Sequence, residues 1–174
     1  GSYLLGSPSR PRSMRRGRLA SIAEITSDKA LADLASSEVL WDRVVEIESR
    51  LAKLPCPLMI EQMGRMKGGQ PLSTPGFQVL LRLLADRKAW VKLSHAYHVS
   101  TAGPPYDDTT PLARACVEAA PDRAVWGSDW PHPMLHGPMP NDGDLLDLLA
   151  RWIPDAAQRQ AVLVDNPARF YGFS

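Results

Sequence analysis

Polar side chains able to do chemistry gather at three places in this sequence, each after a short apolar run. The three groups are Gln62 with Arg65, Tyr97 with His98, and Asp129 with His132. A carboxylate such as that of Asp129 can take a proton from water, or ligate a metal that activates water. Polar residues are also common wherever a strand passes into a loop, so the clustering alone is compatible with an ordinary structural role.

The segment around Asp129 gives the most specific pattern. On a strand, side chains alternate between the two faces, so Val125, Gly127 and Asp129 share one face while Trp126 and Ser128 point to the other. A carboxylate at the tip of the first face would meet a substrate. An isolated Asp-x-x-His is equally typical of an aspartate that caps a turn and a histidine that packs in a loop.

Elsewhere, the apolar pattern predicts strands that alternate with helices. The predicted strands are 58–60, 89–93 and 124–126, with a further short strand at 39–41. The first predicted helix covers 41–54, and the next two begin at Thr74-Pro75 and at Thr110-Pro111. A fourth helix is capped by Asn141 or Asp142 and closed by Pro154, and a last one covers 155–164 and ends before Asn166-Pro167. Such alternation implies right-handed βαβ units and a parallel sheet. Because functional groups of parallel α/β folds lie at the carboxyl ends of the strands, the three polar groups should meet at one edge.

Length and composition describe an ordinary globular chain. The 174 residues contain 44% hydrophobic and 22% charged residues, which excludes a fibrous repeat and wholesale disorder. No apolar stretch reaches the about 20 residues needed to cross a bilayer, so we expect no membrane partner. Two cysteines, Cys56 and Cys116, fit small buried hydrophobic residues in a reducing compartment, and we therefore expect a cytoplasmic protein.

The first 30 residues differ from the rest of the chain. Five of the 20 basic residues precede the first acidic residue, Glu24, which leaves 15 to set against 19 acidic ones. This segment fits a disordered or irregular tail best, with an organelle transit peptide or an arm for acidic surfaces as alternatives. No aromatic residue alternates with the arginines, so nucleic acid is a disfavoured partner. The predicted division is a basic segment 1–30 and a folded part 31–174.

The string Gly127-Ser128-Asp129-Trp130-Pro131-His132 resembles the final strand of metal-dependent hydrolases of the amidohydrolase-2 family, nearest to its 2-pyrone-4,6-dicarboxylate lactonase branch. Met63-Gly64-Arg65, Trp90-Val91-Lys92-Leu93-Ser94 and Asn166-Pro167-Ala168-Arg169-Phe170-Tyr171-Gly172 match the family in the same order. The resemblance implies a (β/α)8 barrel, of which this chain would hold about the last three to four βα units. It also implies that Asp129 is a general base, or a metal ligand in relatives that use zinc.

Three departures from the family pattern bear on activity. Glu61-Gln62 stands where the family has Asp-His, and an amide is a poor metal ligand. His98 takes the place of a substrate-binding arginine and lacks its bidentate fork. No His-x-His pair is present, and a complete barrel takes about 250 residues, so the first half of the barrel is missing. The open sheet edge that results predicts a homo-oligomer or a partner that supplies the missing half.

Two hypotheses follow. The first is a hydrolase that opens a small carboxylated lactone with water activated by Asp129, the substrate being held by Gln62, Arg65, Tyr97, His98 and His132. The second is a catalytically impaired or truncated remnant that acts only through association. Gln62, His98 and the absent first half of the barrel favour the second hypothesis, whereas the resemblance favours the first.

Overall fold

The computed structural model describes residues 40–132, 135 and 137–173. The basic segment predicted over residues 1–30, and the question of its disorder, lie outside the described residues. His136 does too. Within the described part of the chain, no helix is both long and apolar enough to span a membrane.

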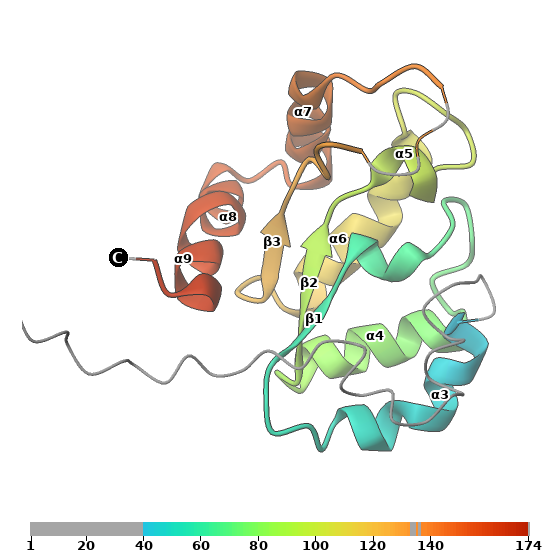
Figure 1. Cartoon of the computed structure of the whole chain (residues 1–174), viewed down its shortest axis with the longest axis vertical. Coiled ribbons are helices and arrows are strands. Elements are labelled where there is room, and N and C mark those ends of the chain that lie inside the picture. Colours follow the sequence, from blue (N-terminus) through green and yellow to red (C-terminus); the bar gives the residue numbers. More distant parts are fainter. Residues whose placement is uncertain (1–39, 133–134, 136, 174) are drawn as a thin grey trace, which may run out of the picture.

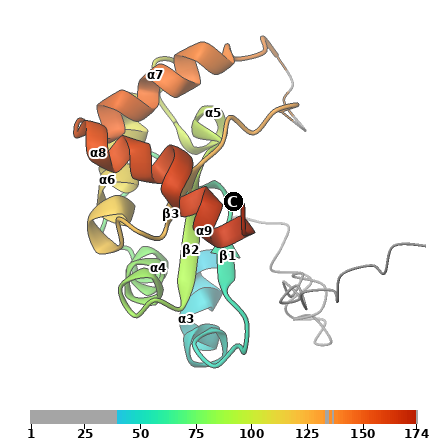
Figure 2. The same cartoon turned by 90° about the vertical axis from the view of Figure 1, so that its left-hand side faces the viewer.

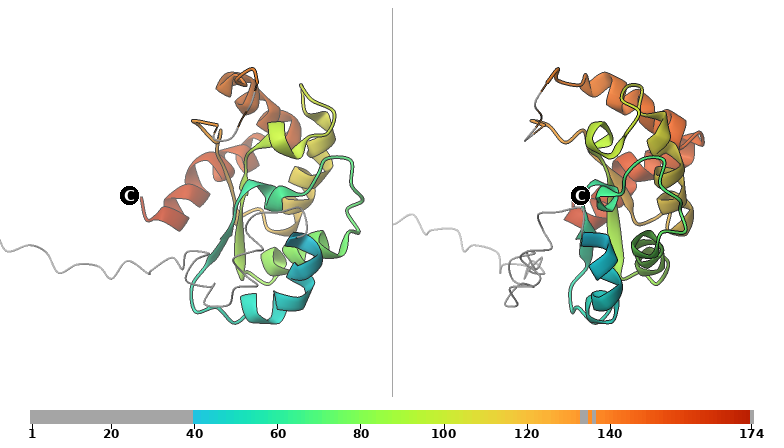
Figure 3. Two further views of the ribbon diagram at one scale, coloured as in Figure 1. Left: turned by 45° about the vertical axis from the view of Figure 1, so that its right-hand side comes forward. Right: turned by 90° about the vertical axis from the view of Figure 1, so that its right-hand side faces the viewer.

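A parallel sheet of three strands forms the centre of the fold (Figure 1). The strands are β1 (Leu58–Ile60), β2 (Ala89–Leu93) and β3 (Ala124–Trp126), in the order β1-β2-β3. All three have the bounds that the apolar runs predict. The segments that follow the strands lie at one end of the sheet, so residues far apart in sequence meet there (Figure 3).

Helices cover one face of this sheet. Helices α4 (Pro75–Ala85) and α6 (Thr110–Ala119) pack against each other and against the core side of the strands, while α3 (Leu40–Leu51) packs on α4 and α7 (Asp142–Trp152) on α6. Their apolar stripes close a core with Val91 and Leu93 of β2, and its largest buried members include Phe77, Leu80, Leu84, Leu112, Leu148 and Leu149. Short helices η2 (Gln62–Arg65), α5 (Ala96–Val99) and η3 (Asp107–Thr109) lie in the connecting loops.

The opposite face of the sheet carries different residues. Strand alternation and register place Trp90, Lys92 and Val125 there. The Trp90 ring packs at 5.0 Å from the ring of Phe170, and Lys92 Nζ lies 2.8 Å from Glu61 Oε1. Gly127 belongs to the same face, since a Cβ there would lie 3.6 Å from Lys92 Cδ. The alternation predicted for Val125 and Gly127 is therefore confirmed.

The prediction at the start of the described chain was wrong in two respects. Residues 40 and 41, expected in a strand over 39–41, belong to α3, and α3 ends at Leu51 rather than at residue 54. The backbone N–H groups of Lys53 and Leu54 bond to carbonyls three residues earlier, a tightened last turn that precedes Pro55. Leu54 is thus an apolar residue just past the helix end.

The predicted starts of α4 and α7 are correct, but only one of the two has the capping hydrogen bond that was expected. Thr74 precedes α4, yet its hydroxyl donates to the carbonyl of Pro71 at 2.6 Å instead of capping the helix. Asn141 does cap α7, because its side-chain oxygen accepts from the N–H of Gly143 at 2.7 Å. Helix α5 was not predicted from the sequence.

The C-terminal helix does not end before Asn166-Pro167, so that prediction was wrong. The chain continues from α8 (Ala156–Gln160) through a π-helical turn, η4 (Ala161–Asp165), into α9 (Asn166–Tyr171), and Figure 2 shows them as one rod beside β3. Proline lacks an N–H, and it is tolerated here because Pro167 lies in the first turn of α9.

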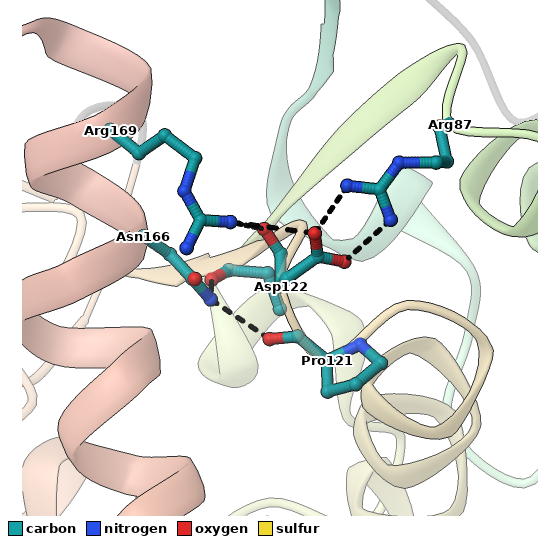
Figure 4. Close-up of polar contacts among 6 residues, drawn as sticks. Arg87, Pro121, Asp122, Asn166 and Arg169 are labelled. Atoms are coloured by element: carbon teal, nitrogen blue, oxygen red, sulfur yellow. Dashed lines mark hydrogen bonds and ion pairs between the residues drawn. The ribbon is translucent and has the colours of Figure 1, made fainter.

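Polar contacts at the start of the strands hold this rod to the sheet (Figure 4). Asn166, which is 1% exposed, donates to the carbonyls of Pro121 at 2.9 Å and Ala124 at 2.8 Å. Arg169 and Arg87 both pair with the carboxylate of Asp122. This cluster is at the opposite end of β3 from Asp129, and its role is structural.

Candidate active site

Asp129 is the meeting point of the three strand ends. It follows β3 in a left-handed backbone conformation, with φ of 72°, and its side chain is 14% exposed. Oδ2 accepts a hydrogen bond of 2.7 Å from the hydroxyl of Tyr97, and Oδ1 accepts a longer one of 3.4 Å from Nε2 of Gln62. The carboxylate is therefore held by groups that follow β1 and β2, and it remains reachable from solvent.

Gln62 and Arg65 form the wall of the site that follows β1. Arg65 Nε donates to Gln62 Oε1 at 2.7 Å, which leaves the amide nitrogen of Gln62 turned toward Asp129. An amide can donate and accept at once, so it links the guanidinium of Arg65 to the carboxylate. Arg65 is itself exposed, and its charge is thus available at the mouth of the site.

Tyr97 and His95 form the wall that follows β2. Burial, together with the hydrogen bond to Asp129, raises the pKa of Tyr97, so the phenol stays protonated and donates to the carboxylate. Nδ1 of His95 lies 2.7 Å from Asp129 Oδ2, although it makes no hydrogen bond of good geometry there. Burial lowers the pKa of His95 to about 4, against the opposing charge of Asp129. His95 is consequently neutral at pH 7.

Three rings stack over this wall. The three rings contact one another: His95 stacks on Tyr97 at 4.7 Å and on His98 at 4.3 Å, with interplanar angles of 22° and 24°, and Tyr97 and His98 meet at 4.9 Å. His95 is buried beneath its neighbours, whereas His98 is exposed. The imidazole of His98 is therefore the member of the stack that can meet a ligand.

His132 lies behind Tyr97. Its ring meets the Tyr97 ring edge-on at 5.2 Å, and its side chain is 1% exposed. Nε2 is 3.1 Å from Oδ1 of Asp142 in the first turn of α7. In this structure His132 thus supports Tyr97 and α7, and its ring does not reach the exposed side of Asp129.

Left-handed backbone conformations concentrate at the site. Residues there with positive φ are Gln62, Met63, Arg65, His95, Asp129 and His132. Such a conformation costs on the order of 1–3 kcal/mol for a non-glycine residue and persists where the surrounding structure enforces it, commonly at functional sites. These conformations follow each strand end, and among these residues Gln62 and His95 have side chains that contact Asp129.

The donor set around Asp129 fits a metal ion poorly. The described residues contain no group of three or more His, Cys, Asp or Glu side chains that could hold one. Asp129 and His95 are the two donors at the centre, and Gln62 contributes an amide in place of a third strong ligand.

Of the residues singled out in the sequence, Gln62 and Tyr97 contact Asp129 directly, and Arg65 acts through Gln62. His98 and His132 contact the ring of Tyr97 and, in the described structure, are linked to Asp129 through it. His95 was not chosen as a site residue, although it is the first histidine after β2. Its turn toward Asp129 depends on a φ of 66°, which no sequence pattern indicates.

Comparisons with known proteins identify the family of this chain. An amidohydrolase family model, Amidohydro_2, matches residues 30–173. The chain belongs to this family. It is 45% identical over 124 residues to a 4-sulfomuconolactone hydrolase of Rhizobium radiobacter, covering 70% of this chain and 42% of that protein. It is 37% identical over 127 residues to a 2-pyrone-4,6-dicarboxylate hydrolase of Comamonas testosteroni, covering 68% and 42%.

Solved structures of relatives share the fold of this part. An apo crystal structure of a protein from Agrobacterium tumefaciens matches with a TM-score of 0.68 and 30% identity, over 77% of this chain and 48% of that one. A Burkholderia multivorans amidohydrolase with bound zinc matches with a TM-score of 0.60 and 22% identity, over 78% and 51%. The chain thus spans about half the length of the relatives that it matches.

Proposed function

We propose that this chain carries the general base of a lactone-hydrolysing amidohydrolase, and that the base is Asp129. The observation that supports this most is the convergence on its carboxylate of groups from both neighbouring strand ends, Tyr97 at 2.7 Å and Gln62 at 3.4 Å. The similarity to two lactone hydrolases favours this role over that of an inactive remnant.

The proposed reaction needs one water molecule and one cyclic ester. Asp129 takes a proton from water while the water oxygen bonds to the lactone carbonyl carbon. The ring C–O bond then breaks, and the proton held by Asp129 passes to the departing ring oxygen, which gives an open-chain acid. The protonated phenol of Tyr97 and the amide of Gln62 keep the carboxylate oriented through both steps.

We assign substrate binding to the exposed cationic and imidazole groups at the mouth. Arg65 is fixed by its bond to Gln62 and offers its remaining N–H groups to a carboxylate or sulfonate of the substrate. His98 adds a second donor on the opposite wall. Together they favour a small anionic lactone. His132 acts by positioning Tyr97, because its own ring is buried.

Zinc is the cofactor that the family resemblance suggests, and the residues present fit it poorly. Around this carboxylate, His95 is the strong donor that lies next to Asp129, Gln62 is a poor third ligand, and the described residues contain no group of three or more His, Cys, Asp or Glu that could hold a metal. The base mechanism therefore rests on the protein's own side chains.

The three strands and their helices are proposed to be the last units of a (β/α)8 barrel. We propose that association completes it, through a second copy or through a chain that supplies the remaining units, because β1 and β3 are the outer strands of the sheet described here. Sedimentation of the purified chain should then show a species larger than 19.1 kDa. A strict monomer that hydrolyses lactones would contradict the association.

The two unpaired thiols fit a reducing, cytoplasmic compartment.

Lactone hydrolysis by the wild type and by Asp129→Asn tests the function. We expect 4-sulfomuconolactone or 2-pyrone-4,6-dicarboxylate to be opened by the wild type, with a loss of about 100-fold or more in kcat for the variant. Asp147→Asn, an exposed aspartate on α7, is the matched control and should retain the wild-type rate. Equal rates for all three proteins would remove Asp129 from the reaction.

A further inference from the structure

Two loops border the Asp129 site, and they are joined at Gly68. The first loop follows η2, which carries Gln62 and Arg65; the second follows α5, which carries Tyr97 and His98. The N–H of Gly68 donates to the carbonyl of Val99 at 2.7 Å, and the carbonyl of Gly68 accepts from the hydroxyl of Thr101 at 3.2 Å.

Asp108, in η3, holds the second loop in place. Its Oδ2 accepts from the backbone N–H of Thr101 at 2.7 Å and the N–H of Ala102 at 3.2 Å, and it lies 3.1 Å from the Thr101 hydroxyl, whose one proton is shared between Oδ2 and the Gly68 carbonyl. Its Oδ1 accepts from Ser100 Oγ at 2.5 Å. Burial alone would raise the pKa of Asp108, but these hydrogen bonds keep that pKa below its usual value. A carboxylate that accepts from Ser100 Oγ and from two backbone N–H groups of one loop fixes the backbone around it.

Gly68 approaches this carboxylate so closely that a side chain at position 68 would have to displace it. A Cβ on Gly68 would lie 2.2 Å from Oδ2 and 2.6 Å from Cγ of Asp108, far inside normal contact. Gly68 is buried, so the added atom could not turn away to solvent. Close approach to Asp108 therefore accounts for the glycine, whose φ does not lie in the left-handed region.

We propose that Asp108 is a positioning residue that, with Gly68, sets the separation of the two walls that hold Asp129. The walls meet at the carboxylate through Gln62 on one side and Tyr97 on the other, and the Gly68–Asp108 contact is the packed junction between the loops behind them. The kinetic test of this proposal depends on the proposed lactonase function, whereas the structural test does not.

The first measurement does not require activity. His95 is buried under the rings of α5, so a loosened second loop should expose it and move its pKa from about 4 toward 6.5. We expect NMR titration of the imidazole to show a rise of about 1 or more in Asp108→Ala, given the usual cost of burial. Asp107→Ala is the matched control, since Asp107 is the neighbouring exposed carboxylate and pairs with Arg151 instead. It should leave His95 unchanged.

The second measurement uses the contact itself. Gly68→Ala should displace the Asp108 carboxylate, and the clash should be relieved when Asp108 is already alanine. The two single variants should therefore shift His95 in the same direction, and the double variant should shift it no further than Asp108→Ala alone. If Asp108→Ala does not fold, Asp108→Asn, which keeps one acceptor oxygen but loses the charge, replaces it in the titration of His95, and Asp108→Ser, which lacks the Oδ2 atom that a Cβ at position 68 would lie nearest to, replaces it in the double variant.

Kinetics add a readout specific to the site. A shift of the walls by about 1 Å should lower kcat/KM by about 10- to 100-fold in Asp108→Ala, with part of the loss in kcat, while Asp107→Ala stays at the wild-type value. A wild type without lactonase activity would overturn the proposed function alone, since the titration of His95 still decides the positioning role. An unchanged His95 pKa in Asp108→Ala, or additive effects of the two substitutions, would overturn the proposal.

Discussion

Lowering the pH from 7 to 5 should destabilise this protein through His95. Its imidazole has a pKa of about 4 when folded, against 6.5 as its ordinary value, because it is buried under Tyr97 and His98. Between these values the unfolded chain binds a proton that the folded protein does not, so the free energy of unfolding rises with pH across this window. The contribution is fully present above pH 6.5 and is lost as the pH falls toward 4.

The two pKa values set the size of the effect. Integrating the proton linkage from pH 7 to pH 5 gives a loss of about 2 kcal/mol from His95 alone. Other groups titrate in the same range, so the assay is a comparison of urea unfolding at both pH values for the wild type and His95→Asn. Asparagine tolerates the φ of 66° at this position and does not titrate.

The wild type should lose about 2 kcal/mol more than His95→Asn between the two pH values. An equal loss in both proteins would refute the reasoning, as would an imidazole that NMR shows titrating near 6.5. Either result would mean that the ring stack does not exclude water from His95 in solution.

Three further predictions concern other parts of the molecule. Asn166→Ala should lower the free energy of unfolding by about 2–4 kcal/mol, because the carbonyls of Pro121 and Ala124 lose their buried donor. Asn141→Ala removes only a helix cap and should lower it by about 1 kcal/mol, so equal losses in the two variants would argue against the buried contacts. Cys116 is fully buried, and burial raises the pKa of its thiol to about 12, so a maleimide should label Cys56 alone in the folded protein and both cysteines in urea. Rapid labelling of both cysteines without denaturant would contradict the burial of Cys116. Arg65→Lys should raise KM for an anionic lactone about tenfold with a smaller effect on kcat, since lysine lacks the fork that binds Gln62 and the substrate together; an unchanged KM in steady-state assays would remove Arg65 from binding.

The sequence predicted the strands better than anything else. Each is a short apolar run closed by turn residues, and this local signal was enough to give the bounds of β1, β2 and β3. The same reasoning brought Gln62, Tyr97 and Asp129 to one edge, because the carboxyl ends of parallel strands must meet there.

What the sequence did not show depends on tertiary contacts. The C-terminal rod passes through Asn166-Pro167 because the buried Asn166 bonds to the carbonyls of Pro121 and Ala124, two partners more than 40 positions away in the sequence. His95 joins the site through a left-handed turn that the packing around it enforces. Sequence periodicity carries neither kind of information.

A single turnover in ¹⁸O-labelled water tests the role of Asp129 most directly. With enzyme in excess over lactone, an Asp129-activated water puts one ¹⁸O atom into the new carboxylate of the product and none into the protein. Mass spectrometry of the product and of the peptide that contains Asp129 reads both. Label in the product alone is the predicted result; label in the carboxylate of Asp129 would show that it attacks the lactone itself, and would contradict the role of general base.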